Sequence, residues 1–300
     1  MIKNMIKNMI KFEYSTDYLS NEYNNLTFYI KKDIKYLMQL GTNSGKDIFN
    51  NICVYMNDAN IILVEANKIH NQNIINNYDE IKNKNNIFII NKAIVLSSYN
   101  KDTIEFYNYE NNEQSSIIKN GSTVQNINYE ILEVGTIKFN DILDSFNFYN
   151  LELLMIDLEG LDYELLMDIN FELVPNLKYI FFEGYHIDEK YNTIINNEKI
   201  AMPVFGKKFK KLIDKLIYNN YVIKIISPNF YDLLFEKEDV NKDNYHNYLV
   251  ETNTINYYSN NNSNNSNNNN SNNKIVNYIF LQIIKLKSYY NHKLISKYTI

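Results

Sequence analysis

The chain has 300 residues, of which 45% are hydrophobic and 14% aromatic, so it can bury one substantial core and carry appendages. Thirty lysines, no arginine and 35 acidic residues give a net charge of −5, which argues against binding to nucleic acid or an anionic membrane. Cys53 is the only cysteine, so disulfides and zinc–cysteine clusters are excluded, and we expect a reducing, cytoplasmic compartment.

The first part of the chain alternates between two periodicities. Residues 1–12 read MIKN, MIKN and MIKF, a repeated tetrad without the apolar core of a signal peptide, and we expect an N-terminal extension over residues 1–30. Apolar runs then alternate with segments of helical spacing, which predicts βαβ units and a parallel sheet. The expected strands cover residues 36–40, 61–65 and 86–96, and the expected helices cover residues 44–55 and 68–81.

Residues 99–138 break this rhythm with alternating runs such as TIEFY and TIKF between Asn-rich turns, which predicts an inserted β-hairpin or lid. Afterwards strands are expected over 151–157, 177–183, 221–226 and 230–236, with helices near 163–168 and 207–219. The turn between the last two strands is too short for a crossover, so this pair must be antiparallel. An α/β sheet of about seven strands, mostly parallel, with a C-terminal antiparallel hairpin and helices on both faces, resembles the Rossmann-like class I methyltransferase fold.

These patterns divide the chain into four parts. We expect the folded domain over residues 31–250, followed by an Asn- and Ser-rich linker over 251–273 that has too little apolar surface to fold. The apolar face and the lysines of residues 274–300 predict an amphipathic helix that docks on the domain or on a partner. No stretch approaches the roughly 18 to 20 apolar residues of a membrane span, so we expect no stable membrane insertion.

Four of the expected strands end in polar or glycine-containing motifs. They are QLGTNSGKD (39–47), LVEAN (63–67), MIDLEG (155–160) and FFEGYH (181–186). Because ligands of open α/β sheets bind at the carboxyl ends of the strands, these motifs should face one crevice.

Gly41 and Gly45 are spaced as GxxxG, which gives weak support for a cofactor turn, since close helix packing also favours two glycines. Glu65 lies at the end of the second expected strand, about twenty residues after the glycine turn. At this position an acid can accept hydrogen bonds from both hydroxyls of a ribose. A helix cap or a solvated loop acid is the alternative for Glu65. A helix that starts near Ser44 would direct its N–H groups toward an anion, such as the carboxylate of S-adenosylmethionine.

Together these motifs resemble the FkbM-type S-adenosylmethionine-dependent methyltransferases. The resemblance covers residues 36–236 through QLGTNSG, VEAN, NKAIVLS, IDLEGLDYELL and YIFFEGYH. It implies S-adenosylmethionine as cofactor and O-methylation of a hydroxyl on a sugar or other small molecule. The cofactor-binding residues that we assign are Gln39, Gly41, Asn43, Gly45, Glu65, Ala66, Asn67, Asn91 and Asp157. Two positions depart from the family pattern, because Gln39 replaces an acid and Ala66 replaces a proline.

The expected catalytic residues lie at the ends of the apolar strands expected over 151–157 and 177–183. Asp157 is placed to orient or deprotonate the acceptor hydroxyl, and Glu159 to bind substrate or cap the next helix. Glu183 and His186 complete the cluster, although His186 alone also fits an ordinary loop histidine. Three carboxylates can hold a divalent cation, but the spacing forces no ligand set, and we do not favour a metal.

The remaining residues of reactive type match no motif. His70, His246 and His292 are interpreted as surface or packing residues, and Cys53 as a core residue.

Two other functions stay open. A catalytically inactive, methyltransferase-like binding module is compatible with the sequence, since a fold does not imply a function. An NAD-dependent oxidoreductase is disfavoured by the missing third glycine and by the terminal antiparallel hairpin. The partner we expect is a small-molecule or glycan hydroxyl acceptor; neither its identity nor the oligomeric state follows from the sequence.

Overall fold

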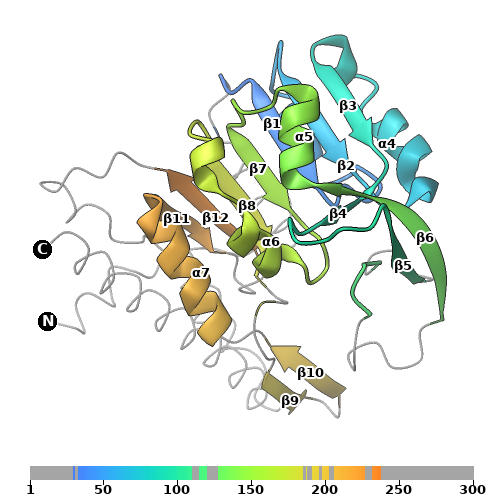
Figure 1. Cartoon of the computed structure of the whole chain (residues 1–300), viewed down its shortest axis with the longest axis vertical. Helices are drawn as coiled ribbons and strands as arrows, with labels where there is room; N and C mark the ends of the chain where they lie inside the picture. Colours follow the sequence, from blue (N-terminus) through green and yellow to red (C-terminus); the bar gives the residue numbers. More distant parts are fainter. Residues whose placement is uncertain are drawn as a thin grey trace, which may run out of the picture. The chain divides into compact units, whose positions relative to one another are not determined.

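A computed structural model describes residue 30 and residues 33–109, 115–119, 128–184, 187, 191–195, 198–202, 206–226 and 232–237 (Figure 1). The chain divides into two compact units, Ser20–Glu183 and Met1–Leu19 with Gly184–Ile300, and each is described by itself. The predicted linker over 251–273 and the predicted helix over 274–300 lie outside the described residues, as do the first 29 residues of the predicted extension.

Five parallel strands form the centre of the unit Ser20–Glu183. In the order β3-β2-β1-β7-β8, they are Asn86–Ile90, Asn60–Val64, Tyr36–Leu40, Leu153–Ile156 and Tyr179–Glu183. Leu40, the last residue of β1, pairs with Val64 on one side and Ile156 on the other, so β1, β2 and β7 end level with one another. All four residues of β7 are buried, as the continuous apolar run predicts for a strand covered on both faces.

The helices of this unit are short. They are α3 (Ile48–Cys53), α4 (Asn71–Asn77), α5 (Phe139–Phe146) and α6 (Asp162–Asp168), with 3-10 turns η1 (Lys68–His70), η2 (Ile81–Asn83) and η3 (Phe171–Leu173). Helix α5 buries Phe139, Ile142 and Leu143 and lies in front of the strands in Figure 1. The ring of Phe146 contacts the ring of Phe88 on β3 edge to face, with 5.3 Å between centroids.

Two sequence expectations differ from the structure. The first helix begins at Ile48 and not near Ser44, because Asn43 and Gly45 have left-handed backbone conformations that turn the chain, and Asp47 then caps the helix. The strand expected over 86–96 breaks after Ile90 into β3 and a separate strand, β4 (Ala93–Val95).

Strand β4 belongs to a second, three-stranded sheet. Within residues 99–138, strands β5 (Thr103–Tyr109) and β6 (Tyr129–Lys138) pair antiparallel, and β4 pairs parallel with β6. The inner face of this sheet buries Ala93, Phe106 and Val134, against which Ala66 packs. Strand β6 runs directly into α5, a helix that the sequence pattern did not predict (Figure 1).

In the unit that contains Gly184–Ile300, strands β9 (Tyr191–Ile195) and β10 (Glu198–Met202) form an antiparallel hairpin. Helix α7 (Lys207–Tyr218) follows and buries its apolar face, including Phe209, Leu212 and Leu216. Strands β11 (Tyr221–Ile226) and β12 (Asp232–Lys237) pair antiparallel, as predicted. The largest sheet has seven strands in the order β11-β12-β8-β7-β1-β2-β3 and is mostly parallel. This topology confirms the predicted α/β, Rossmann-like fold class. Within the described ranges, no helix has the length and apolarity needed to cross a membrane.

Candidate functional site

A pocket lies at the carboxyl ends of the parallel strands in the unit Ser20–Glu183. It is lined by segments that follow β1 (Gly41, Asn43), β2 (Glu65, Ala66, His70), β3 (Lys92) and β7 (Asp157, Leu158, Glu159), and by hairpin residues Phe106, Ser115, Ser116 and Ile117. Three of the four motifs that were expected to share one crevice, those after β1, β2 and β7, line this pocket. The described residues of the motif after β8 do not contribute to the lining, and the segment after β3 does. The segment expected as an inserted hairpin or lid thus lines the pocket, although the sequence did not identify which of its residues do so.

The turn after β1 lies directly against the loop after β7. Gly41 has a φ of +84°, and a Cβ atom built there would lie 1.7 Å from the carbonyl oxygen of Asp157. The N–H groups of Gly41 and Thr42 both donate to the carbonyl of Val64, at 3.0 and 3.1 Å. Only glycine fits at this position, and its close approach brings the first turn and the acidic loop together.

Glu65 joins two loops at the tip of β2. Its carboxylate accepts the N–H of Asn43 and the N–H of Asn67, each at 2.7 Å, and the side chain is only 7% exposed. Burial raises the pKa of this carboxyl, while the backbone hydrogen bonds oppose that shift. Because a carboxylate oxygen accepts more than one hydrogen bond, Glu65 can hold these loops and still accept hydroxyls from a ligand in the pocket.

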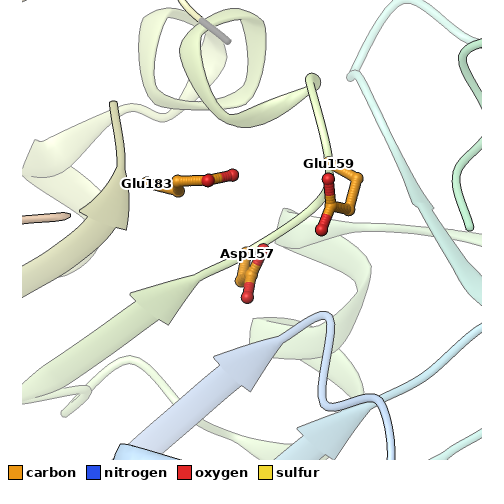
Figure 2. Close-up of side chains that lie close together, drawn as sticks. All are labelled: Asp157, Glu159 and Glu183. Carbon is orange, nitrogen blue, oxygen red and sulfur yellow. The ribbon is translucent and has the colours of Figure 1, made fainter. Parts of the chain in front are cut away.

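Three carboxylates lie close together beside the turn that follows β1. Figure 2 shows Asp157 at the end of β7, Glu159 on the following loop and Glu183 at the end of β8. One carboxylate oxygen from each lies within 4.8 Å of the other two. Asp157 is exposed, and the other two are half-buried. Oxygen ligands of this kind suit Mg²⁺ or Ca²⁺, but an acidic cluster alone does not define a metal site.

Two further side chains fix the acidic loop. The carboxylate of Asp162 accepts the N–H groups of Leu158 and Gly160, both at 3.2 Å, and the hydroxyl of Ser116 donates to the carbonyl of Leu158 at 3.2 Å. Sequence reasoning missed both residues. Asp162 lies within the IDLEGLD motif and could have been noticed, whereas Ser116 is 42 residues away from the loop in sequence and has no motif of its own.

Four of the residues that we assigned to the cofactor lie outside the pocket lining. Gln39 is fully buried and donates from Nε2 to Asp47; its Oε1 is sealed without a hydrogen-bond partner among the described residues. Gly45 lets the backbone approach the ring of Tyr78.

The other two are Asn67 and Asn91, whose side chains bond within the protein. Asn67 caps η1 and donates to Asn108, while Asn91 donates to the carbonyl of Glu65 at 2.7 Å. All four thus make their contacts within the protein and do not line the pocket in this structure.

The expected anion site at the first helix is wrong. Helix α3 has six residues, and its N-terminus is capped by the carboxylate of Asp47, which accepts the N–H of Asn50 at 3.1 Å. Burial raises the pKa of Asp47, against the opposing hydrogen bond from Gln39. Because the protein supplies its own acid here, this end of the helix is not available to a ligand anion.

The structure describes one of the four histidines and the single cysteine. His70, interpreted from sequence as a surface or packing residue, is 7% exposed and lines the pocket, and burial lowers its pKa, which favours the neutral imidazole. His186, His246 and His292 lie outside the described residues. Cys53 is fully buried in the core, as predicted, and burial raises the pKa of its thiol.

No protein-family model matches the chain, and no curated protein matches it. Among solved structures, it is similar to a protein of the NADB-Rossmann superfamily from Streptococcus agalactiae, with 12% identity over 93% of this chain and 98% of that chain and a TM-score of 0.37. It is also similar to TrmK of M. capricolum in complex with S-adenosyl-homocysteine, with 11% identity over 89% and 97% of the two chains and a TM-score of 0.34. Likenesses this distant carry no information on substrate or activity.

Proposed function

We propose that this chain is an S-adenosylmethionine-dependent methyltransferase that methylates a hydroxyl of a sugar or other small molecule, as the FkbM resemblance implies. The observation that carries the proposal is Glu65. Its buried carboxylate lines a pocket at the tip of β2 and shares that pocket with Asp157 at the tip of β7. A ribose-binding acid and a catalytic acid, two strands apart, suit a nucleoside cofactor that lies across the strand ends.

The strand order gives the cofactor a direction. Strands β3, β2, β1 and β7 follow one another across the sheet, so a ribose bound at Glu65 would have the segment after β3, with Lys92, on one side and the segments after β1 and β7, with Gly41 and Asp157, on the other. The transferred methyl group must lie beside the acid that handles the acceptor. The sulfonium end of a bound cofactor would therefore lie toward Asp157, and its nucleobase would lie toward the segment after β3.

When bound, S-adenosylmethionine would supply an electrophilic methyl group on a positively charged sulfur. The residues of the chain provide alignment and a base. Asp157 would accept the proton of the acceptor hydroxyl, and the oxygen of that hydroxyl would take the methyl group as the sulfur–methyl bond breaks. Glu159 and Glu183 would orient the acceptor, and the carboxylates would attract the positively charged sulfur of the bound cofactor.

The hairpin of β5 and β6 supports an acceptor role for the inserted segment. Phe106 and Ile117 offer apolar surface to the pocket, and Ser115 and Ser116 lie beside them. Apolar surface suits the carbon skeleton of a small organic acceptor or a sugar ring, while the hydroxyls of Ser115 and Ser116 bond within the protein, to Asn108 and to the carbonyl of Leu158. An inactive binding module would have the same fold, so the test must measure cofactor binding first and methyl transfer second.

Replacing Glu65 with Gln tests the proposal directly. The variant loses the charge that strengthens hydrogen bonds from ribose hydroxyls, which is worth about 1.5 to 3 kcal/mol, or roughly 10- to 150-fold in affinity. We expect the dissociation constant for S-adenosylhomocysteine, measured by calorimetry, to rise by that factor.

The matched control is Glu152→Gln. Glu152 also accepts two backbone N–H groups, from Lys35 at 2.6 Å and Tyr36 at 3.1 Å, but beside the first residue of β1, at the opposite end of that strand from the pocket. The Glu152→Gln substitution should lower the free energy of unfolding without changing the affinity for the cofactor. Unchanged affinity in a folded Glu65→Gln protein would contradict the assignment of Glu65.

A further inference from the structure

Leu158, the residue between Asp157 and Glu159, has both of its backbone polar groups bound by side chains from elsewhere. Its N–H donates to Oδ1 of Asp162, and its carbonyl accepts the hydroxyl of Ser116, each at 3.2 Å. The N–H belongs to the peptide that links Asp157 to Leu158, and the carbonyl belongs to the peptide that links Leu158 to Glu159. Fixing these two peptide planes fixes the directions in which the two carboxylate side chains leave the backbone.

The two side chains that hold Leu158 are themselves fixed. Asp162 is 1% exposed and uses its second oxygen to accept the N–H of Gly160. Ser116 is 2% exposed and pairs with Tyr107 of β5 through two backbone hydrogen bonds, of 2.8 and 3.2 Å. Hydrogen bonds of such buried groups compete little with water, so this arrangement can hold a loop at the edge of an open pocket.

The loop needs such support. Glu159 has a φ of +51°, a left-handed conformation that costs a non-glycine residue roughly 1 to 2 kcal/mol and persists only where neighbouring structure enforces it. On the other side, the N–H of Asp157 donates to the carbonyl of Leu40 at 2.9 Å, and its own carbonyl lies against Gly41. The segment is thus held by β1, by α6 and by the hairpin.

We propose that Ser116 and Asp162 are positioning residues, which hold Leu158 so that the carboxylates of Asp157 and Glu159 face the sulfonium and the acceptor hydroxyl. This inference rests on the proposed function and adds to it. It makes the inserted hairpin part of the catalytic alignment, because Ser116 belongs to the hairpin side of the pocket and touches the acidic loop directly.

The test compares two ligands that differ by one charge. S-adenosylmethionine carries a positive sulfur, and S-adenosylhomocysteine carries a neutral one, so the ratio of their dissociation constants reports whether a carboxylate faces the sulfur. We expect the wild-type protein to prefer S-adenosylmethionine by roughly fivefold or more, from the attraction of one charge pair at about 4 Å. Ser116→Ala and Asp162→Asn should each reduce this preference by about threefold, while affinity for S-adenosylhomocysteine changes less than twofold.

The structure offers matched controls for both substitutions. Asp168 accepts the N–H and the hydroxyl of Ser97, both at 2.7 Å, in a pair outside the pocket lining. Ser97→Ala and Asp168→Asn therefore remove comparable hydrogen bonds and should leave the ligand preference as in the wild type. A general loss of stability would lower both affinities together and would not change their ratio.

A double-mutant cycle identifies the route of the effect. In a protein that already carries Asp157→Asn and Glu159→Gln, Ser116→Ala should change the ligand preference no further. If Asp162→Asn fails to fold, Ser116→Ala decides alone. The inference is overturned if both ligands bind the wild type equally, if Ser116→Ala keeps the wild-type preference, or if its effect persists in the doubly substituted background. A wild-type protein that binds neither ligand would overturn the proposed function as well.

Discussion

Glu65 holds two loops together in the structure and, in the function that we propose, also binds the cofactor. It is buried, and burial is the main reason that its pKa is raised above the ordinary value of 4.5. The raised pKa means that this group contributes stability below pH 4.5, and that the contribution is lost as the pH rises through its pKa in the folded state. Ribose hydroxyls donate to the ionised form, so a bound cofactor should lower this pKa again.

The pH dependence of binding follows from this linkage. As the pH falls from neutral toward 4.5, Glu65 takes up a proton and affinity for S-adenosylhomocysteine should fall. In the same range, binding should release protons, which calorimetry detects when the titration is repeated in buffers of different ionisation enthalpy. The Glu65→Gln protein should release none. Proton uptake on binding by the wild type would contradict the assigned role.

Asp157 should separate binding from chemistry. Asp157→Asn keeps the shape of the side chain and removes its capacity to accept a proton, so cofactor should still bind while methyl transfer falls by about two to four orders of magnitude. The measurement is single-turnover transfer of a labelled methyl group to an acceptor found by screening sugars and small hydroxyl compounds.

Chelator treatment of the unmutated protein checks the alternative of a divalent cation among Asp157, Glu159 and Glu183. Activity that survives chelation supports the metal-free alignment that we favour. Full activity of Asp157→Asn would reduce these carboxylates to a structural role.

The sequence predicted which residues end the buried strands, but not which side chains enter the pocket. Glu65 and Asp157 were found because acids directly after buried strands are rare without a purpose. Gln39 was misjudged because side chains alternate between the faces of a strand, and its side chain points into the core toward Asp47. His70 and Ser116 reach the pocket through tertiary packing that no local pattern contains.

Among the structural elements, the turn after β1 is the most constrained. Gly41 has a positive φ, and any Cβ atom there would overlap the Asp157 carbonyl. Sequence spacing identified the glycine pair but assigned the following residues to a helix, because Ile48, Ile52 and Tyr55 share a helical period. The left-handed conformations of Asn43 and Gly45 delay that helix until Asp47 can cap it.

Gly41→Ala should therefore be destabilising by about 3 kcal/mol or more, because backbone strain adds to displacement of the acidic loop. Urea unfolding measures the loss. Gly135→Ala in β6 is the matched control, since the nearest atom to a Cβ there is 3.7 Å away and no left-handed conformation is involved. It should change stability by less than about 1 kcal/mol. Equal stability of the two variants would contradict the close packing of the turn against Asp157.

At the scale of the whole molecule, the alternation of strand and helix patterns was sufficient to predict the α/β class and the antiparallel final pair. Helix α5 and the β9–β10 hairpin were not predicted, because the first follows β6 without a turn signal and the second lies in a polar region without clear period. No acceptor follows from the sequence for a physical reason: the inserted hairpin lines part of the pocket, and its contacts depend on packing and not on a motif.

The most direct test of the central claim is calorimetric titration of the full chain with S-adenosylhomocysteine and with NAD under identical conditions. Both ligands contain an adenine-bearing ribose that an acid such as Glu65 can bind, but only the first suits a pocket without a pyrophosphate-binding GxGxxG turn. We predict saturable binding of one S-adenosylhomocysteine per chain and no measurable binding of NAD at the same concentrations. Binding of NAD without binding of S-adenosylhomocysteine would contradict the account.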